Sequence, residues 1–416
     1  MIFYRETEFK ETEIGKIPKE WEVVRLQEIS KIIMGQSPSS STYNSKGFGL
    51  PFLQGKLEFG EIFPSPSIFC SNPIKIADAN DILISVRAPV GDVNLAPFKL
   101  CIGRGLAAIR FHYKTTSYLF YFYYLQKMKS HLEAQGKGST FKALVKDDLE
   151  NFVVALPSLQ EQQKIAEVLS TVDSAIESVD RVIQKTERLK KGLMQELLTK
   201  GIGHKEFKET SIGKIPKTWQ IVKLGDIVLE AKSGFASGKR DDNGILQLRM
   251  DNIETEGWIN PEAGVKVPMP PDVEEYLLKP NDILFNNTNS VDLIGKTAIF
   301  RGELPKCVYS NHLTRIRVNL NKVIPEWILF VLIKKWQTGV FKALCHRHVH
   351  QAGINNSDLL NIKFPLPEIS EQQKITQILS TTDKKLKIER QEKARLEKIK
   401  QGLMDLLLTG KIRVKV

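Results

Sequence analysis

Residues 9–29 read FKETEIGKIPKEWEVVRLQEI, and residues 207–227 read FKETSIGKIPKTWQIVKLGDI. The two stretches are identical at 14 of 21 positions, at an offset of 198 residues. A second repeated pair, residues 161–176 (EQQKIAEVLSTVDSAI) and 371–386 (EQQKITQILSTTDKKL), is identical at nine of 16 positions at an offset of 210. A period of about 200 residues is too long for a solenoid, so the sequence predicts two tandem domains.

Each domain has the pattern of a mixed α/β (α+β) fold. Short β-rich runs separated by Gly, Pro, Asn and Asp predict strands, among them residues 82–86 and 283–286 after the shared NDIL tetrapeptide. Residues 118–133 and 326–344 predict a helix at matched places. Between the repeated segments the sequences of the two halves diverge, so we expect two domains with similar flanking segments and different inserts between them.

A long helix is predicted after each domain. In the first, Ser158 is a candidate N-cap with Glu161 three residues later, and the segment has no proline up to residue 199. A heptad frame that starts at Ile165 has ten a and d positions, of which eight are apolar. The ten positions are Ile165, Leu169, Val172, Ile176, Val179, Ile183, Thr186, Lys190, Leu193 and Leu197. The second copy has a weaker frame, with apolar residues at Ile375, Leu379, Leu386, Leu396, Leu403 and Leu407. The pattern favours an antiparallel coiled coil between the two helices; the alternative is that each helix packs on its own domain.

The expected boundaries are a first domain at residues 1–157, a spacer helix at 158–202, a second domain at 203–367 and a second spacer helix at 368–416. The first helix exits through LLTKGIGHKEFKETSIG, whereas the second exits through LLTGKIRVKV, and the missing continuation occurs at residues 9–15. We therefore expect residues 1–20 to dock near the end of the second long helix, which gives a pseudo-two-fold chain.

Composition limits the possible partners. Lysine and arginine exceed aspartate and glutamate by 60 to 48, a formal charge of +12 with a pI of about 9.3, which suits a polyanion. The four cysteines are scattered without a C-x-x-C pair, which argues against a disulfide scaffold or a zinc ribbon. No secretory signal or membrane span is predicted, so we expect a cytoplasmic protein.

Catalytic motifs are missing from the sequence. It contains no P-loop, no G-x-S-x-G elbow, no H-E-x-x-H and no Asp/Asn-Pro-Pro-aromatic tetrapeptide. We therefore predict a chain that is not an enzyme and binds no cofactor or metal. Residues 345–350 (CHRHVH) leave two alternatives: a three-histidine metal face, or a polar loop that presents histidines and Arg347 to DNA. The second is favoured, because the first copy has a glycine-rich loop without ligands at this place.

Three motifs, each present twice and in the same order, resemble the specificity subunits of type I restriction-modification systems. They are I-G-x-I-P-x-x-W at residues 14–21 and 212–219, L-P-x-x-x-E-Q-x-x-I at 156–165 and 366–375, and G-L-M-x-x-L-L-T at 192–199 and 402–409. The resemblance covers essentially the whole chain. It implies that the variable parts are target recognition domains for double-stranded DNA and that the long helices are spacers that also bind methyltransferase subunits. It further implies two modification (M) subunits with S-adenosylmethionine, and restriction (R) subunits with ATP and Mg.

Two unlike readers on one rod predict a split DNA target with a fixed gap. Roughly 39 helical residues give a rod of about 58 Å, which caps the distance between half-site centres at about 17 base pairs. Allowing for half-sites of about three to five pairs, we expect a gap of about 5 to 9 pairs. The candidate DNA-contacting residues lie in polar loops after strands: Gln36, Ser37, Ser39, Thr42, Tyr43, Arg87, Lys137, Ser139, Thr140, Lys142, Lys232, Ser233, Lys239, Arg240, Asn286, Asn287, Asn289, His346, Arg347, His348, His350 and Gln351. The alternative functions are a protein-only coiled-coil scaffold, or a fused restriction or methylation enzyme with a divergent active site.

Overall fold

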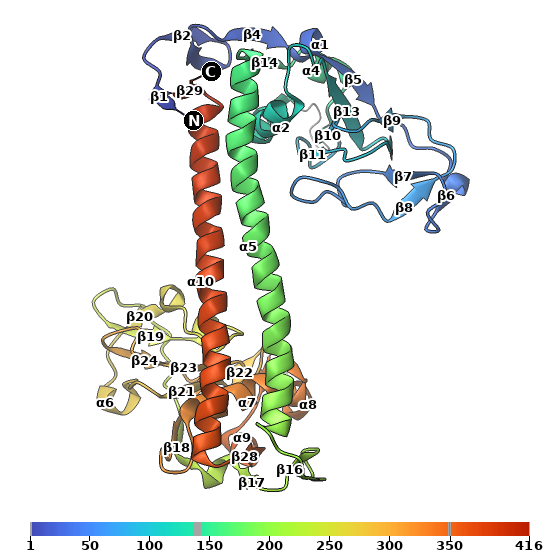
Figure 1. Ribbon diagram of the computed structural model, residues 1–416. Coiled ribbons are helices and arrows are strands. Elements are labelled where there is room, and N and C mark those ends of the chain that lie inside the picture. Colours follow the sequence, from blue (N-terminus) through green and yellow to red (C-terminus); the bar gives the residue numbers. More distant parts are fainter. Residues whose placement is uncertain (1, 136–142, 348, 350, 416) are drawn as a thin grey trace. The chain divides into compact units, whose positions relative to one another are not determined.

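The computed structural model describes residues 2–135, 143–347, 349 and 351–415 (Figure 1). The chain forms two compact units, of which the first contains Met1–Asp180 and Gln391–Val416 and the second Arg181–Arg390. Two long helices, α5 (Leu159–Lys200) and α10 (Ile369–Leu407), each contribute one part to each unit. Among the described residues, no helix is both long and apolar enough to cross a membrane.

The first unit contains two larger sheets and separate pairs of strands. Its strands are β1 (Phe3–Arg5), β2 (Phe9–Thr12), β3 (Gly15–Pro18), β4 (Glu22–Arg25), β5 (Ser30–Met34), β6 (Tyr43–Asn44), β7 (Leu50–Leu53), β8 (Ile68–Cys70), β9 (Ile76–Ala77), β10 (Ile82–Ser85), β11 (Val93–Leu95), β12 (Leu100–Ile102), β13 (Leu106–Phe111), β14 (Val153–Leu156) and β29 (Ile412–Val414). Its shorter helices are α1 (Leu26–Ile29), α2 (Tyr118–Lys127), α3 (Lys129–Gln135) and α4 (Lys146–Glu150), with the 3-10 turn η1 (Ser40–Thr42). The antiparallel sheet has the order β11-β10-β13-β5, and the mixed sheet β6-β8-β7-β12-β9 has β7 and β12 parallel. The strand pairs are β1-β29, β2-β3 and β4-β14. All four side chains of β10 are buried, as expected for a central strand with both faces covered.

The second unit repeats this plan. Its strands are β15 (Phe207–Lys208), β16 (Ile215–Pro216), β17 (Gln220–Lys223), β18 (Val228–Ser233), β19 (Ile245–Leu248), β20 (Val265–Val267), β21 (Ile283–Asn286), β22 (Thr288–Asn289), β23 (Thr297–Ile299), β24 (Cys307–Tyr309), β25 (Leu313–Val318), β26 (His346–Arg347), β27 (Ala352–Gly353) and β28 (Lys363–Leu366). Its shorter helices are α6 (Val273–Tyr276), α7 (Pro325–Gln337), α8 (Val340–Leu344) and α9 (Asn356–Leu360), with the 3-10 turns η2 (Leu224–Asp226), η3 (Met250–Asn252) and η4 (Pro261–Ala263). The order β18-β25-β21-β23 matches β5-β13-β10-β11 of the first unit, and β19 and β24 are parallel, like β7 and β12. The predicted mixed α/β fold in two tandem copies is confirmed.

The shared NDIL tetrapeptide builds the same turn in both units. Asn80 and Asn281 have φ angles of 70° and 77°, a left-handed conformation that asparagine tolerates better than most residues. Asp81 and Asp282 accept a hydrogen bond from the backbone N–H three residues earlier, at 2.8 Å in each unit. Each aspartate also forms an ion pair with an arginine of the neighbouring strand, at 2.8 Å for Arg110 of β13 and 2.7 Å for Arg317 of β25. These contacts fix the turn that precedes β10 in the first unit and β21 in the second.

The repeated tryptophan and the repeated EQ pair form a joint at the start of each long helix. Trp21 Nε1 donates to Glu161 Oε2 at 3.0 Å, and Trp219 Nε1 donates to Glu371 Oε2 at 2.9 Å. Next to these glutamates, Gln162 Nε2 donates to the Pro157 carbonyl at 2.8 Å, and Gln372 makes the same bond to Pro367 at 2.9 Å. The most specific motifs of the sequence are therefore structural joints between sheet and helix.

The two long helices run antiparallel within each unit. In the first, Asp173 of α5 pairs with Lys400 of α10 at 2.6 Å, and Asp180 pairs with Lys393 at 2.8 Å. Seven residues forward along α5 therefore correspond to seven residues back along α10. In the second, Lys190 of α5 pairs with Asp383 of α10, with side chains 9% and 7% exposed. The predicted packing of the two helices is confirmed, but polar pairs occupy part of the seam.

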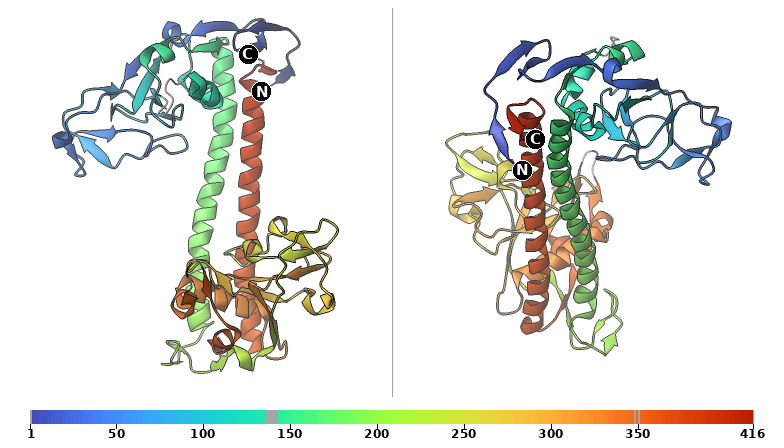
Figure 2. Two further views of the ribbon diagram at one scale, coloured as in Figure 1. Left: turned by 180° about the vertical axis from the view of Figure 1, so that it is seen from behind. Right: turned by 45° about the horizontal axis from the view of Figure 1, so that its top comes forward.

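The chain ends also meet within the first unit. Strand β1 pairs antiparallel with β29, with Phe3 opposite Val414 and Arg5 opposite Ile412, and the N and C labels lie side by side in the views of Figures 1 and 2. The Arg413 guanidinium from β29 reaches Glu161 at the start of α5 and Glu6 near the N-terminus. The N-terminal strand is thus held by the strand that follows α10.

Two predicted helices are interrupted. The helix predicted at residues 118–133 divides into α2 and α3 around Met128, and the one predicted at 326–344 divides into α7 and α8. Gly339 precedes α8 with φ of 78°, which no helical residue can adopt, so the break there has a clear cause.

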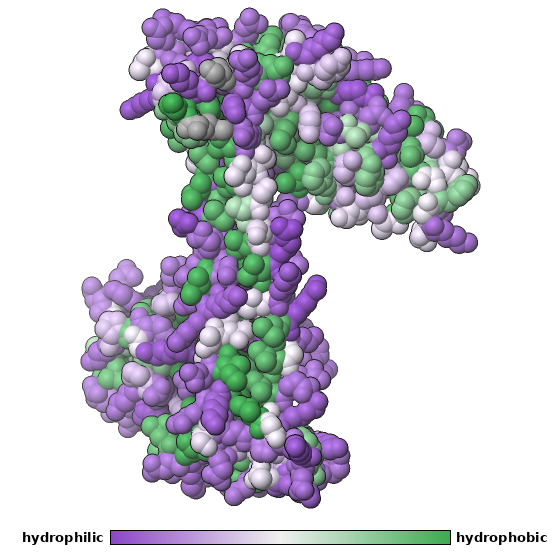
Figure 3. Space-filling view, viewed as in Figure 1, coloured by the Kyte–Doolittle hydropathy of each residue, from purple (hydrophilic) through white to green (hydrophobic). Residues whose placement is uncertain are grey.

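On the part of the first unit that carries β6 to β9, hydrophobic side chains are mixed with hydrophilic ones at the surface (Figure 3). The exposed hydrophobic residues there include Phe48, Leu57, Phe63, Ile68, Ile74 and Ile76.

Candidate nucleic-acid interface

Three loops of the first unit converge at one end of its sheets. The loop after β5 contains Gly35, the loop after β7 contains Gln54, and the loop after β12 contains residues 103–105. They are joined by backbone hydrogen bonds, from Gly35 N to the Leu106 carbonyl at 2.9 Å and from Gly103 N to the Leu53 carbonyl at 2.8 Å. A Cβ at Gly35 would lie 2.2 Å from the Gly103 carbonyl oxygen, so this close approach requires glycine. We call this region, residues 35–37, 54, 87 and 103–105, the first loop edge.

Polar side chains of the first loop edge are held in place by one hydroxyl group. Ser37 Oγ donates to Gln54 Oε1 at 2.9 Å and accepts from the backbone N–H of Arg104 at 3.2 Å. The side chains of Gln36, Gln54, Arg87 and Arg104 are exposed. Neither arginine forms an ion pair with a described residue. The first loop edge therefore offers arginine and amide groups to a ligand outside the fold.

The second unit builds an equivalent region, the second loop edge, from residues 234–235, 249, 288 and 310–312. Gly234 N donates to the Leu313 carbonyl at 3.1 Å, and Ser310 N donates to the Leu248 carbonyl at 2.9 Å, the same bonds as in the first unit. A Cβ at Gly234 would lie 2.1 Å from the Tyr309 carbonyl oxygen. Arg249 Nε donates to Gln247 Oε1 at 3.3 Å, and Asn311 is exposed at the tip of its loop.

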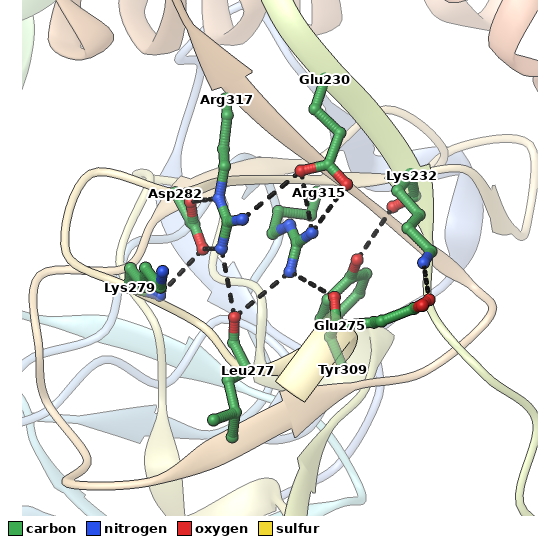
Figure 4. A network of polar contacts seen from close by, with 9 residues as sticks. All are labelled: Glu230, Lys232, Glu275, Leu277, Lys279, Asp282, Tyr309, Arg315 and Arg317. Carbon is green, nitrogen blue, oxygen red and sulfur yellow. Dashed lines mark hydrogen bonds and ion pairs between the residues drawn. The ribbon is translucent and has the colours of Figure 1, made fainter. Parts of the chain in front are cut away.

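A network of polar contacts surrounds the buried Arg315 and includes Tyr309, which is next in sequence to the second loop edge (Figure 4). Arg315 of β25 is 2% exposed; its Nη2 donates to both oxygens of Glu230 at 2.9 Å, and its Nη1 donates to the Glu275 carbonyl at 2.9 Å. The Tyr309 hydroxyl donates to the Lys232 carbonyl at 3.2 Å. The Lys232 ammonium pairs with Glu275, whose carboxylate raises the pKa of that lysine. The network ties β18, β25 and the segment around α6 together.

The predicted contact residues of the first unit differ in their exposure and in their hydrogen bonds. Gln36 and Arg87 are exposed, and Ser37 positions its neighbours as described above. Thr42 Oγ1 donates to the Ser39 carbonyl at 2.7 Å, and Tyr43 stacks on Phe52 with its hydroxyl on the Pro38 carbonyl. Burial raises the pKa of the Tyr43 phenol. Thr42 and Tyr43 thus hold the shape of the loop, while Ser39 is exposed and close to Ser41. The predicted residues Lys137, Ser139, Thr140 and Lys142 lie outside the described residues.

The asparagines predicted to contact bases in the second unit lie inside the fold. Asn286, Asn287 and Asn289 are 0%, 7% and 9% exposed. The Asn287 amide donates to Thr314 Oγ1 at 2.9 Å and to the Asn311 carbonyl at 3.1 Å. Asn287 therefore supports the loop that carries Asn311, while Asn289 Oδ1 accepts from the Ser290 N–H at 2.7 Å. Ser233 belongs to the same buried cluster, through Thr314 and Asn287.

The remaining predicted residues of the second unit occupy two loops. Lys239 and Arg240 are exposed and form no ion pair with a described residue. His346, Arg347 and Gln351 are exposed, and His346 Nε2 lies 2.7 Å from Asp358 Oδ2. His348 and His350 lie outside the described residues, so the three-histidine alternative is untested. In the described part of the chain, no group of three or more His, Cys, Asp or Glu residues could hold a metal ion.

Sequence reasoning missed four residues that the loop edges present: Gln54, Arg104, Arg249 and Asn311. A signal for the first two was available, since Arg104 lies between Gly103 and Gly105, and Gln54 precedes Gly55. Glycine next to a polar residue is typical of tight loops that expose it. The second pair has no such flanks, and only its register with the first unit reveals it.

Comparisons with known proteins agree with this architecture. Residues 18–188 and 216–398 each match the type I restriction modification DNA specificity domain. A putative type I restriction enzyme MjaX specificity subunit of Methanocaldococcus jannaschii is 53% identical over 193 residues, a match that covers 46% of this chain and 45% of that relative. The MjaVIII specificity subunit of the same organism is 30% identical over 100% of this chain and 98% of its own length.

A solved structure supports the fold. The S subunit of a type I restriction-modification system from M. genitalium has a TM-score of 0.63 at 16% identity, covering 93% of this chain and 96% of that one. Both halves of the chain match the same DNA specificity domain, and the match to the MjaVIII subunit extends over the full length. The chain therefore belongs to the family of type I restriction-modification DNA specificity subunits.

Proposed function

We propose that this chain binds double-stranded DNA and reads a split target, one half with each unit, for a type I restriction-modification enzyme. The observation that carries the proposal is the pair of loop edges, which share one backbone arrangement and present different polar side chains. Exposed arginine and amide groups are the side chains that best recognise base edges in the major groove. The net charge of +12 favours a polyanion.

The proposal includes the partners that carry out the chemistry. We expect the chain to be non-catalytic and to direct two methyltransferase (M) subunits and restriction (R) subunits in the cytoplasm, where the DNA lies. S-adenosylmethionine, ATP and Mg would be bound by those subunits and not by this chain. The thiols of Cys101 and Cys307 are consistent with a non-catalytic role, because burial raises the pKa of each to about 12, so that both stay protonated at neutral pH.

A split methylation motif is the first expected result. Because α5 is one continuous helix of 42 residues, about 63 Å long at about 1.5 Å per residue, a rod of this length limits the distance between half-site centres to about 18 base pairs. Below that limit, we expect an unread gap of about 5 to 9 base pairs between the half-sites. The measurement is sequencing of DNA methylated by the complex of this chain with the M subunits of its own organism. A contiguous motif contradicts the proposal.

Steep salt dependence of DNA binding is the second expected result. If about six phosphates are neutralised, the affinity should fall roughly 10³-fold between about 50 and about 200 mM salt. A titration of the full chain with its M subunits on duplexes with and without the motif measures this, and the duplex without it should also respond to salt. An affinity that stays constant over this range instead supports a protein-only scaffold.

A further inference from the structure

The sheets define which residues of the two loop edges are equivalent. Leu53 and Ile102 are paired in the parallel strands β7 and β12, and Leu248 and Tyr309 are paired in β19 and β24. Gln54 follows Leu53 and Arg249 follows Leu248, so these two residues occupy one position of the fold. In the same way, Arg104 and Asn311 are each two residues beyond the paired strand residue. The backbone bonds that join the loops in one unit recur in the other.

Arginine and amide are exchanged between the two positions. The first loop edge has an amide at the first position and an arginine at the second, namely Gln54 and Arg104. The second loop edge has Arg249 and Asn311, which is the opposite order. Around them the framework is alike, so the exchange changes the chemistry of the surface without changing its backbone.

Two of the four side chains, Gln54 and Arg249, are held by hydrogen bonds, and Arg104 and Asn311 are fixed through their backbones. Gln54 Oε1 accepts from Ser37, and no described residue receives a hydrogen bond from its amide NH2 group. Arg249 is half-buried and is held through Nε by Gln247, which is 1% exposed and also donates to the Phe235 carbonyl at 2.9 Å. Asn311 is fixed through its backbone, because its carbonyl accepts from Asn287 and its N–H donates to Phe235. Such support lowers the entropy lost when a side chain binds.

We infer that the exchanged pair, Gln54 with Arg104 and Arg249 with Asn311, determines which bases each half-site contains. The inference rests on the proposed function. Arginine recognises guanine through O6 and N7, and glutamine or asparagine recognises adenine through N6 and N7. Equivalent positions in the two half-sites should therefore show guanine in one half where the other has adenine. The buried Asn287 and the partly exposed Ser37 act as positioning residues.

The test uses the full chain assembled with its M subunits and a DNA library randomised at both half-sites, read by methylation sequencing. In Arg104→Ala, we expect one base pair of the first half-site to lose at least about fivefold of its discrimination, with the second half-site unchanged. In Asn311→Ala, the second half-site should relax and the first should stay unchanged. The unaffected half-site shows in each case that the variant is folded and assembled.

Lys114→Ala is the matched control, because Lys114 is an exposed cation of the first unit outside the loop edge. It should leave both half-sites unchanged. The inference is overturned if Arg104→Ala and Asn311→Ala leave the motif intact, or lower the affinity equally for all sequences, which is the behaviour of a phosphate contact. A split motif in the wild-type complex would in either case still support the proposed function, whereas a contiguous motif in the wild type is the failure of that function itself.

Discussion

Arg413→Met is expected to lower the free energy of unfolding of the first unit by about 3–5 kcal/mol. The Arg413 side chain is 7% exposed, and its guanidinium pairs with Glu161, whose side chain is 2% exposed. Nη1 also donates to Glu6 Oε2 at 2.6 Å and Nη2 to Glu20 Oε2 at 2.9 Å. Methionine fills a similar volume but leaves the buried Glu161 carboxylate with the Trp21 indole as its remaining side-chain donor. An uncompensated buried charge costs far more than a lost surface pair.

Chemical denaturation of the full chain measures the effect, with Arg5→Met as the control. Arg5 lies on β1, opposite Ile412 of β29, and is exposed, so its loss should cost less than about 1 kcal/mol. Equal effects of the two substitutions would contradict the assigned role of Arg413. In the second unit, His204 Nε2 lies 2.8 Å from Glu371 Oε1 and the Ile202 N–H donates to the same oxygen at 2.9 Å, so an imidazole and a backbone amide take the place of the arginine.

The repeat and its motifs predicted the fold because they encode local geometry twice. The tryptophan and the EQ pair recur in the sequence because each builds the same hydrogen-bonded joint. The heptad frame was right at six positions and one residue early at three. The six are Ile165, Leu169, Ile176, Ile183, Thr186 and Lys190, and the three are Val172, Leu193 and Leu197. The structure buries Asp173, Met194 and Leu198 in their place. A helix with 3.6 residues per turn drifts relative to a strict repeat of 3.5, which accounts for the shift to Met194 and Leu198 near the end of the helix.

The interface was harder to predict because it depends on which loops meet. A single sequence shows that residues 286–289 (NNTN) are polar, but burial follows from the packing of β21 against β25 and is invisible without it. The sequence therefore could not show that Asn287 supports the loop that carries Asn311. Gln54 and Arg104 are 50 residues apart in the sequence, and their proximity follows from the parallel pairing of β7 and β12.

Lys190→Met is expected to destabilise the second unit by about 3–5 kcal/mol. Lys190 pairs with Asp383 where both side chains are buried in the seam between α5 and α10. Burial raises the pKa of Asp383 even though Lys190 acts in the opposite direction, so desolvation outweighs the attraction between the two charges. The pair therefore adds little net stability, but removing one partner leaves the other without compensation.

The pH dependence and a double substitution separate this explanation from simple loss of packing. A carboxyl group whose pKa is raised by folding binds more protons in the native state, so its contribution to stability falls as the pH rises. The loss in Lys190→Met should therefore be larger at about pH 8 than at about pH 5, where the lone Asp383 takes up a proton. Lys190→Met combined with Asp383→Leu should recover most of the stability, because apolar residues can replace a buried pair at little cost. Lys342→Met, in an exposed pair with Asp292 of the same unit, should cost less than about 1 kcal/mol at either pH. A pH-independent loss that the double substitution does not reverse would show that Lys190 acts through its aliphatic chain, and that the ion pair does not fix the register of the helices.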